Sequence, residues 1–471
     1  MEKTEIKQNT VDKKKETNKM GTAPVNKLML SMGVPMIISM VLQAVYNIVD
    51  SAFVSNMETN GEAALNALTL AFPVQMLMVA FAIGTGVGVN ALISRSLGAN
   101  DKQQANQAAG NGLFLCGIIY IVFLLFGLFG AGFYVATQTD DALITDMTTS
   151  YLRICCTLSF GVIYFGIYEK VLQSTGKSLF STIAQISGAV TNMILDPIMI
   201  YGWLGCPEMG VKGAAYATVV GQMVSLVVAM ILHVAFNKEI SNSVKYLKPS
   251  IKIIGSIYSI GLPAIIAQAL MSFMTYGLNI ILGRIDQNAV TAYGLYYKIQ
   301  QFILFAAFGL RDAITPIVSF NYGMKNQGRV KEGIKCGIGY TLMIMFAGCI
   351  VLEAIAVPFT GAFGLSGTTE ALCISAIRII SVSFMFAGLN ISFQGIYQAL
   401  QSGMESLILS LCRQLIFVLP VAYGLSAVVI GSTSRDASLV WITFPIAEII
   451  TAAIGIIFLK RIYNNKVKAL A

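Results

Sequence analysis

Polar side chains recur at helical spacing inside the most apolar parts of this sequence. Four of them would share one face of a helix: Gln43, Tyr46, Asn47 and Asp50. Further along, Asn192 precedes Asp196 by four residues, and Pro197 follows directly. Because proline breaks the backbone hydrogen-bond ladder, carbonyl oxygens are freed near that carboxylate. Carboxylate, amide and carbonyl oxygens together suit a proton or a small hard cation such as Na⁺.

The depth of these acids within their predicted spans brings them to one level of the membrane. Asp50 lies 22 residues from the inner start of its span, and Asp196 lies 18 residues from the start of its own. Thr218, about two turns from the outer end of another span, reaches a similar depth. A charge at the bilayer centre costs at least about 2.5 to 3.5 kcal/mol, so these acids predict a functional site, with a structural polar network as the alternative.

The elements that carry these residues are membrane-spanning helices. The chain of 471 residues is 56% hydrophobic and 11% charged, with a mean hydropathy of +0.73, whereas soluble domains carry about 25% charged residues. Apolar runs predict twelve spans, which begin near Leu28, Glu62, Gln104, Asp141, Ser178, Val211, Ile251, Asn288, Lys331, Thr369, Glu405 and Ala437. No segment is long enough for a soluble catalytic domain, and no residue is assigned a catalytic role. His233 is the only histidine and is expected at the membrane interface.

Charge placement predicts the orientation. If the N-terminus is cytoplasmic, the inner loops hold twelve basic residues: Arg95, Lys102, Lys170, Lys177, Lys238, Lys245, Lys248, Lys252, Lys325, Arg329, Lys331 and Lys335. The outer loops hold Lys212, Arg284 and Arg435, with the acidic Glu58, Asp140, Asp141 and Glu370. The lysine and arginine bias therefore places both termini inside. The net charge of +8 indicates topology, so no nucleic-acid partner is expected.

An internal repeat divides the chain into halves. The run Ser31-Met-Gly-Val-Pro35 returns as Ser259-Ile-Gly-Leu-Pro263, and Leu97-Gly98 returns as Tyr322-Gly323, at offsets of 228 and 225 residues. Because each half holds an even number of spans, both cross the membrane in the same direction. The sequence thus predicts an all-α polytopic membrane protein of twelve transmembrane helices, arranged as two six-helix lobes related by a parallel pseudo-twofold repeat. Its expected parts are a basic tail (1–27), an N-lobe (28–236), a cytoplasmic linker (237–250), a C-lobe (251–460) and a second tail (461–471).

The chain resembles the multidrug and toxic compound extrusion (MATE) family, closest to its DinF-like and MepA-like bacterial branch. The resemblance covers residues 28 to about 460. It rests on the six-plus-six repeat and on three motifs: Gln43-x-x-Tyr46-Asn47-x-x-Asp50, Leu172-Gln-Ser-Thr-Gly176 and Asn192-x-x-x-Asp196-Pro197. It implies a cofactor-free antiporter of the bacterial cytoplasmic (inner) membrane, which exports cationic amphipathic drugs against H⁺ or Na⁺ by alternating access. A monomer suffices for such a mechanism.

Carried over by position, the family's cation site comprises Asp50, Asn192, Asp196 and Thr218, with Gln43, Tyr46 and Asn47 as the supporting hydrogen-bond network. Family members that also carry acids on the seventh and tenth spans differ from this chain, which has none in 253–283 or 379–398. Methionines that could line an adaptable substrate cavity are Met76, Met193, Met271 and Met274. Filling of packed helix surfaces is the alternative for them.

Other ionisable residues in spans predict ion pairs, namely Glu353 with Arg378 and Arg413 with Glu448. Glu169 and Lys170 are expected to reach the membrane interface, and the sequence assigns no role to Lys298, Arg311 or Asp312. A lipid-linked oligosaccharide flippase of the same superfamily is the second hypothesis. It would need several arginines or lysines facing its cavity to bind a pyrophosphate.

Overall fold

The computed structural model describes residues 18–57, 60–362, 366–432 and 436–470. Most of the predicted N-terminal tail (1–17), Glu58 and Arg435 therefore lie outside the described residues. The first half of the chain contains α1 (Lys19–Thr22), α2 (Val25–Ser55), α3 (Gly61–Gly98), α4 (Lys102–Leu125), α5 (Ala131–Ala136), α6 (Ala142–Thr157), α7 (Phe160–Ser174), α8 (Ser178–Tyr201) and α9 (Val211–Phe236). The second half contains α10 (Ile251–Gly283), α11 (Gln287–Gly323), α12 (Gln327–Ala362), α13 (Gly367–Ser381), α14 (Phe384–Ala399), α15 (Gly403–Leu411), α16 (Val418–Gly431) and α17 (Thr443–Ile462).

The predicted number of spans is confirmed. Within the described residues, ten helical stretches are long and apolar enough to cross a bilayer, and two bent helix pairs bring the number to twelve. Eleven of the observed helix starts lie within four residues of those expected from the sequence. The twelfth span begins at the expected Ala437, with a 3-10 helical segment (Ala437–Ile442) that leads into α17. Short π-helical segments join α4 to α5 (Phe126–Gly130) and α15 to α16 (Cys412–Ile416).

The bends were not predicted, and they occupy equivalent places in the two halves. The pair α6 and α7 bends by 46°, and the pair α13 and α14 bends by 55°. Each break falls at an apolar residue followed by serine, at Leu158 and Ser159 and at Val382 and Ser383. Because these are the fourth spans of the two halves, the bend is a feature of the repeated unit.

The two halves meet along a seam of close glycine contacts that obeys the repeat. A Cβ added to Gly84 on α3 would lie 2.3 Å from Ile265 on α10, and a Cβ added to Gly309 on α11 would lie 2.7 Å from the backbone of Ile37 on α2. Gly84 and Gly309 differ by 225 residues, and Ile37 and Ile265 differ by 228. Equivalent residues thus make reciprocal contacts, as a pseudo-twofold axis requires.

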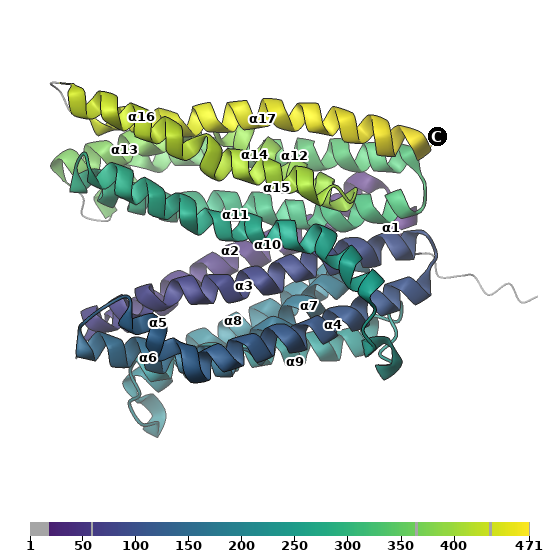
Figure 1. Cartoon of the computed structure of the whole chain (residues 1–471), viewed down its shortest axis with the longest axis horizontal. Coiled ribbons are helices and arrows are strands. Elements are labelled where there is room, and N and C mark those ends of the chain that lie inside the picture. The colour runs from purple at the N-terminus through teal and green to yellow at the C-terminus, as the bar shows by residue number, and fades with distance from the viewer. Residues whose placement is uncertain (1–17, 58–59, 363–365, 433–435, 471) are drawn as a thin grey trace, which may run out of the picture.

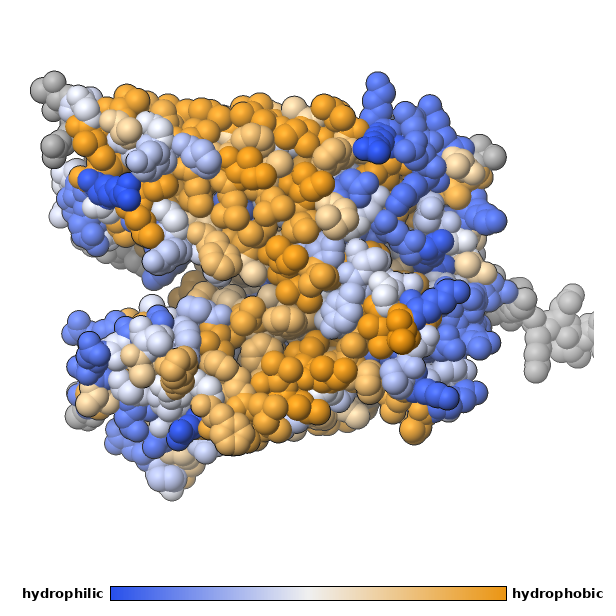
Figure 2. All heavy atoms as spheres, in the orientation of Figure 1, coloured by the Kyte–Doolittle hydropathy of each residue, from blue (hydrophilic) through white to orange (hydrophobic). Residues whose placement is uncertain are grey.

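The seam joins the halves at one end of the molecule only. Figure 1 shows α1 and the C-terminus at the same end, which we call the terminal end, and Figure 2 shows many hydrophilic residues there. At the opposite end, the open end, Figure 2 shows a hollow between the halves. A buried core at the terminal end combines residues of both halves, among them Met29, Ile314 and Tyr397. The structure is therefore closed at the terminal end and open at the other.

Candidate functional site

The predicted cation-site residues come from three neighbouring helices of the first half. Asp50 lies on α2, Asn192 and Asp196 on α8, and Thr218 on α9. All four are buried, with exposed fractions of 8%, 2%, 0% and 3% in that order. The Asn192 amide donates to Asp196 Oδ1 at 3.2 Å and lies 3.5 Å from Thr218 Oγ1. Asp50 lies within electrostatic range of Asp196, so the structure brings all four residues together.

Several acceptor atoms in this cluster have no hydrogen-bond partner. They are the buried oxygens Asp50 Oδ1, Asn192 Oδ1 and Asp196 Oδ2. Neither carboxylate has a salt bridge to a cationic side chain in the described part of the chain. Burial without a counter-charge disfavours an ionised carboxylate, so the cluster suits a proton or a cation that oxygen atoms bind.

The supporting residues are only partly where the sequence placed them. Tyr46 is half-buried and lies beside Thr218, next to the cluster. Gln43 lies further along α2, where its Oε1 accepts a hydrogen bond from Gln185 at 3.3 Å. Asn47, expected on the same face, is exposed, unlike the buried residues of the cluster. The helical spacing was too coarse to separate Asn47 from Tyr46, because adjacent residues differ by about 100° around a helix.

The neighbours that sequence reasoning missed are Gln75 and Tyr151. Gln75 on α3 donates to the buried hydroxyl of Tyr151 on α6 at 3.0 Å, and Tyr151 lies within electrostatic range of Asp50. Both residues occur in apolar runs without a recognisable motif. Only the packing of α6 against α3, which in turn contacts α2, brings them near Asp50.

Lys170 and Glu169 do not reach the membrane interface, which corrects the expectation from the sequence. Both are buried, with Lys170 only 1% exposed. Lys170 Nζ lies 2.6 Å from Asp312 Oδ2, and this ion pair joins α7 of the first half to α11 of the second. Arg311 Nη2 lies 2.8 Å from the other oxygen of Asp312. Snorkelling was the wrong expectation because Lys170 has a buried partner 142 residues away.

The remaining ionisable residues give mixed outcomes. Arg413 and Glu448 form the expected ion pair, with Nε 2.6 Å from Oε1. Glu353 instead accepts a hydrogen bond from Ser381 at 2.6 Å, and no ion pair joins it to Arg378 among the described residues. Lys298 is exposed on α11. His233 lies in the last turn of α9, is 2% exposed and contacts Asn237 and Asn242. Its expected position at the membrane interface stays a prediction.

The four methionines expected to line the substrate cavity have different surroundings. Met271 lines a narrow recess between the halves, whereas Met274 packs against the core of the second half. Met76 and Met193 are half-buried on α3 and α8. A shared methionine surface therefore stays a prediction for the substrate cavity.

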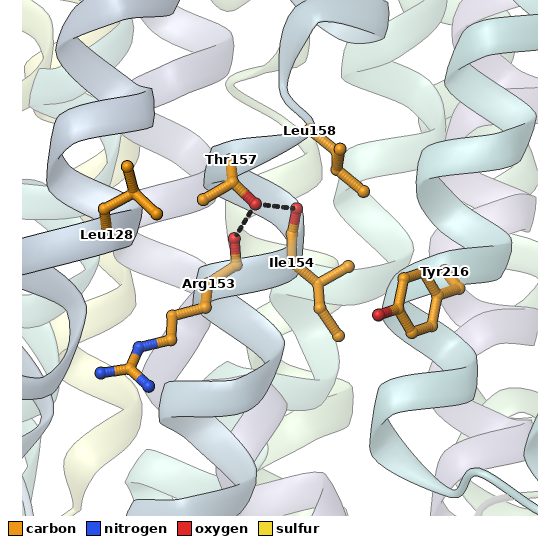
Figure 3. A pocket seen from close by; sticks show the side chains of 6 residues that line it. All are labelled: Leu128, Arg153, Ile154, Thr157, Leu158 and Tyr216. Atoms are coloured by element: carbon orange, nitrogen blue, oxygen red, sulfur yellow. Dashed lines mark hydrogen bonds between the residues drawn. The ribbon is translucent and has the colours of Figure 1, made fainter.

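A separate pocket lies on the outer surface of the first half, near the bend between α6 and α7. Figure 3 shows the side chains that line it: Leu128, Arg153, Ile154, Thr157, Leu158 and Tyr216. The Arg153 guanidinium extends away from Leu158 and Tyr216. None of these belongs to the buried cluster, so we do not place the candidate site there.

Comparison with known proteins decides the family. The MatE family model matches residues 35–198 and, again, residues 263–424, one match in each half. The chain belongs to the MATE family. It is 27% identical to the multidrug export protein MepA of Staphylococcus aureus (strain MRSA252) over 417 residues, which is 86% of this chain and 90% of that protein.

Solved MATE structures have the same fold. One is described as the outward-facing conformation of a multidrug resistance MATE family transporter of the MOP superfamily, with a TM-score of 0.87, 25% identity, and coverage of 97% of this chain and 98% of that one. A second, a MATE protein in complex with MaL6, matches with the same TM-score and identity over 97% of this chain and 99% of that one. The MATE fold, with two lobes of six spans, is thus confirmed for this chain.

Proposed function

We propose that this chain is a secondary active multidrug exporter, which exchanges cationic amphipathic compounds for H⁺ or Na⁺ by alternating access. The name of its MepA relative supports the export of multiple drugs. The proposed ion site is the buried cluster of Asp50, Asn192, Asp196 and Thr218. In this site the ion would be bound by oxygen atoms of the protein, so the proposal needs no cofactor.

One observation carries the ion-exchange part of the proposal. Asp50 and Asp196 are two buried acids within electrostatic range of each other, and neither forms an ion pair among the described residues. Three acceptor oxygens of Asp50, Asn192 and Asp196 lack hydrogen-bond partners. A proton or Na⁺ would satisfy these oxygens, and its loss would leave like charges close together. If the ion and the drug favour different states of the protein, their transport is coupled without any need for direct contact.

The shape of the molecule supports one state of an alternating cycle. The hollow at the open end gives the space between the halves access to one side of the membrane, while the seam closes the other side. Lys170 and Asp312 link the halves within the closed part, and Ser319 on α11 adds a hydrogen bond to the Ala91 carbonyl on α3 at 2.7 Å. In the opposite state these contacts would have to break.

The orientation follows from charge. The predicted inner-loop lysines and arginines, apart from the buried Lys170, lie at or near the connections of the terminal end, between α3 and α4, α7 and α8, α9 and α10, and α11 and α12. The positive-inside rule then makes the terminal end cytoplasmic. We accordingly assign the protein to a bacterial cytoplasmic membrane, with both termini inside and the open end facing outward, and expect the monomer to be the working unit.

The test is efflux of a fluorescent organic cation from proteoliposomes, with a pH gradient or a Na⁺ gradient imposed separately. We expect one gradient to drive transport by wild-type protein and neither to drive it for Asp50→Asn. The neutral amide can neither take up and release a proton nor supply a negative charge to Na⁺. The matched control is Asp146→Asn, which makes the same change at an exposed carboxylate on α6. It should transport as the wild type does.

Full gradient-driven export by Asp50→Asn would contradict the proposed site. Transport by the wild type that responds to neither gradient would contradict antiport and would favour the lipid-linked oligosaccharide flippase. That alternative predicts an anionic substrate, whereas the antiporter predicts cation export stopped by dissipating the coupling gradient.

A further inference from the structure

A recess between the two halves has a chemical character opposite to that of the buried acidic cluster. It lies where α3 meets α10, α11, α14 and the π-helical segment Cys412–Ile416. Its polar lining consists of two arginines and four glutamines: Arg311, Arg413, Gln268, Gln394, Gln398 and Gln414. No acidic side chain of the described residues lines it. The lining therefore offers cationic donors and neutral amides.

The two arginines are held in place from behind by carboxylates that do not themselves line the recess. Arg413 Nε donates to Glu448 Oε1 at 2.6 Å, and Asn390 occupies the other Glu448 oxygen at 2.7 Å. Arg311 donates twice to Asp312 Oδ1, at 3.0 and 2.8 Å. These bonds fix both guanidinium groups at the wall, which is the preorganisation that an anion-binding site needs.

Both guanidinium groups retain donors that the protein does not use. A guanidinium has five N–H donors, yet Arg413 bonds only through Nε, and Arg311 only through Nε and Nη2, within the described residues. The side chains remain 10% and 12% exposed, respectively. In addition, Asp312 is shared between Arg311 and Lys170, so neither cation has that carboxylate to itself.

The glutamines add acceptors next to these donors. Gln394 and Gln398 donate their amide groups to Ser410 at 2.9 Å and Ser406 at 3.4 Å, which leaves their carbonyl oxygens available. The Gln414 Oε1 atom is buried without a partner. The ring of Phe308 also lines the recess and lies 5.0 Å from the Arg311 guanidinium carbon. A ligand with an anionic group, an ammonium group and an apolar ring system would satisfy all three features.

We propose that this recess binds the oxyanion of zwitterionic amphipathic substrates through Arg311 and Arg413. The inference rests on the proposed export function and names a substrate class for it. A carboxylate fits the planar donor face of a guanidinium, and sulfonate or phosphate oxygens share this chemistry. A purely cationic compound would leave these donors unused. The transporter therefore binds amphipaths that carry both charges more tightly than their esterified, purely cationic forms.

The test compares two dyes that differ only in the anionic group. Tetramethylrhodamine carries a cationic ring system and a carboxylate, whereas its methyl ester keeps the cation and lacks the carboxylate. Binding of each dye to the purified full-length chain in lipid nanodiscs is measured by fluorescence anisotropy at equilibrium, without any ion gradient. Wild-type protein should bind the zwitterion about tenfold more tightly, which is the scale of one charge-assisted hydrogen bond.

Two variants remove one guanidinium each while avoiding an unpaired buried charge. Arg311→Gln leaves Asp312 paired with Lys170, and the double variant Arg413→Gln with Glu448→Gln removes both members of that ion pair. Each should weaken zwitterion binding about tenfold and change ester binding less than about twofold. The control is Arg378→Gln, since Arg378 is exposed and lies outside the recess. Thermal melting of each variant reports whether it is folded.

Three results would overturn the inference. They are equal weakening of both dyes, no weakening of either dye, and wild-type protein that binds neither dye or shows no preference. Failure of the proposed function is seen separately, because it concerns gradient-driven transport and Asp50→Asn. A chain that keeps its dye preference but ignores both gradients would contradict antiport and leave the recess assignment intact.

Discussion

At the scale of single residues, Asn192 organises the buried cluster, because its amide contacts both Asp196 and Thr218. Asn192→Ala removes this hydrogen bond and one of the acceptor oxygens that lack partners. We expect the H⁺ or Na⁺ concentration needed for half-maximal transport to rise about tenfold, which is the scale of one hydrogen bond to a charged group. The measurement is dye efflux from proteoliposomes over a titration of the coupling ion.

Asn47→Ala is the matched control for Asn192→Ala. The same residue type is replaced, but Asn47 is exposed and outside the cluster. Its ion dependence should equal that of the wild type. A comparable loss in Asn47→Ala would favour the network expected from helical spacing over the arrangement in the structure.

At the scale of helices, the contact of α3 with α10 closes the terminal end. A Cβ added to Gly88 would lie 2.2 Å from the backbone oxygen of Ile257, a clash that no rotamer change relieves. We expect Gly88→Ala to disfavour the closed seam at the terminal end. The population should then shift toward the opposite state of the cycle, in which the terminal end is open and the other end is closed. Spin labels at Glu62 and Gln287, both exposed at the open ends of α3 and α11, should then give a shorter mean distance by electron spin resonance.

Gly255→Ala on α10 provides the control for the seam. Nothing lies within 4 Å of a Cβ added there. Its distance distribution should match that of the labelled protein without either substitution. The same shift in both glycine variants, or in neither, would refute the role given to the seam.

At the scale of the whole molecule, the ion pair of Lys170 and Asp312 ties the two halves together. Lys170→Met removes the bond between halves but leaves Asp312 with Arg311 on its own helix. We expect the terminal end to open more often. In protein whose eight native cysteines are replaced, a cysteine placed at the buried Ser319 should react several-fold faster with a membrane-impermeant maleimide applied from the terminal-end side.

Lys177→Met tests whether any lysine near this end has the same effect. Lys177 bonds the Phe236 carbonyl, a contact inside the first half. Its variant should leave the maleimide reaction rate unchanged. Equal rates for Lys170→Met and the parent protein would show that the ion pair does not hold this end closed.

The sequence by itself determined the class of protein, the twelve spans and the repeat. Hydropathy is a sum over neighbouring residues, so the starts of the spans were predicted within four residues when the 3-10 segment Ala437–Ile442 is counted with the last span. The repeat that relates Gly98 to Gly323 could likewise be found from the order of residues along the chain alone. The structure adds that both glycines lie in the seam, since a Cβ on Gly98 would lie 1.9 Å from the Phe320 oxygen and one on Gly323 would lie 2.0 Å from the Arg95 oxygen. The ion role of Asp50 and Asp196 stays a prediction, although the structure places them together.

Only the tertiary structure decided which distant residues meet. Lys170 and Asp312 are separated by 142 residues, and no local pattern marks either as the other's partner. The exposure of Asn47 depends on how α2 packs, because a helical spacing gives a face but not its orientation. The recess combines Arg311 and Arg413 from different helices, so its charge is visible only after packing. Local composition fixes which segments enter the membrane, whereas buried charges need partners that long-range packing supplies.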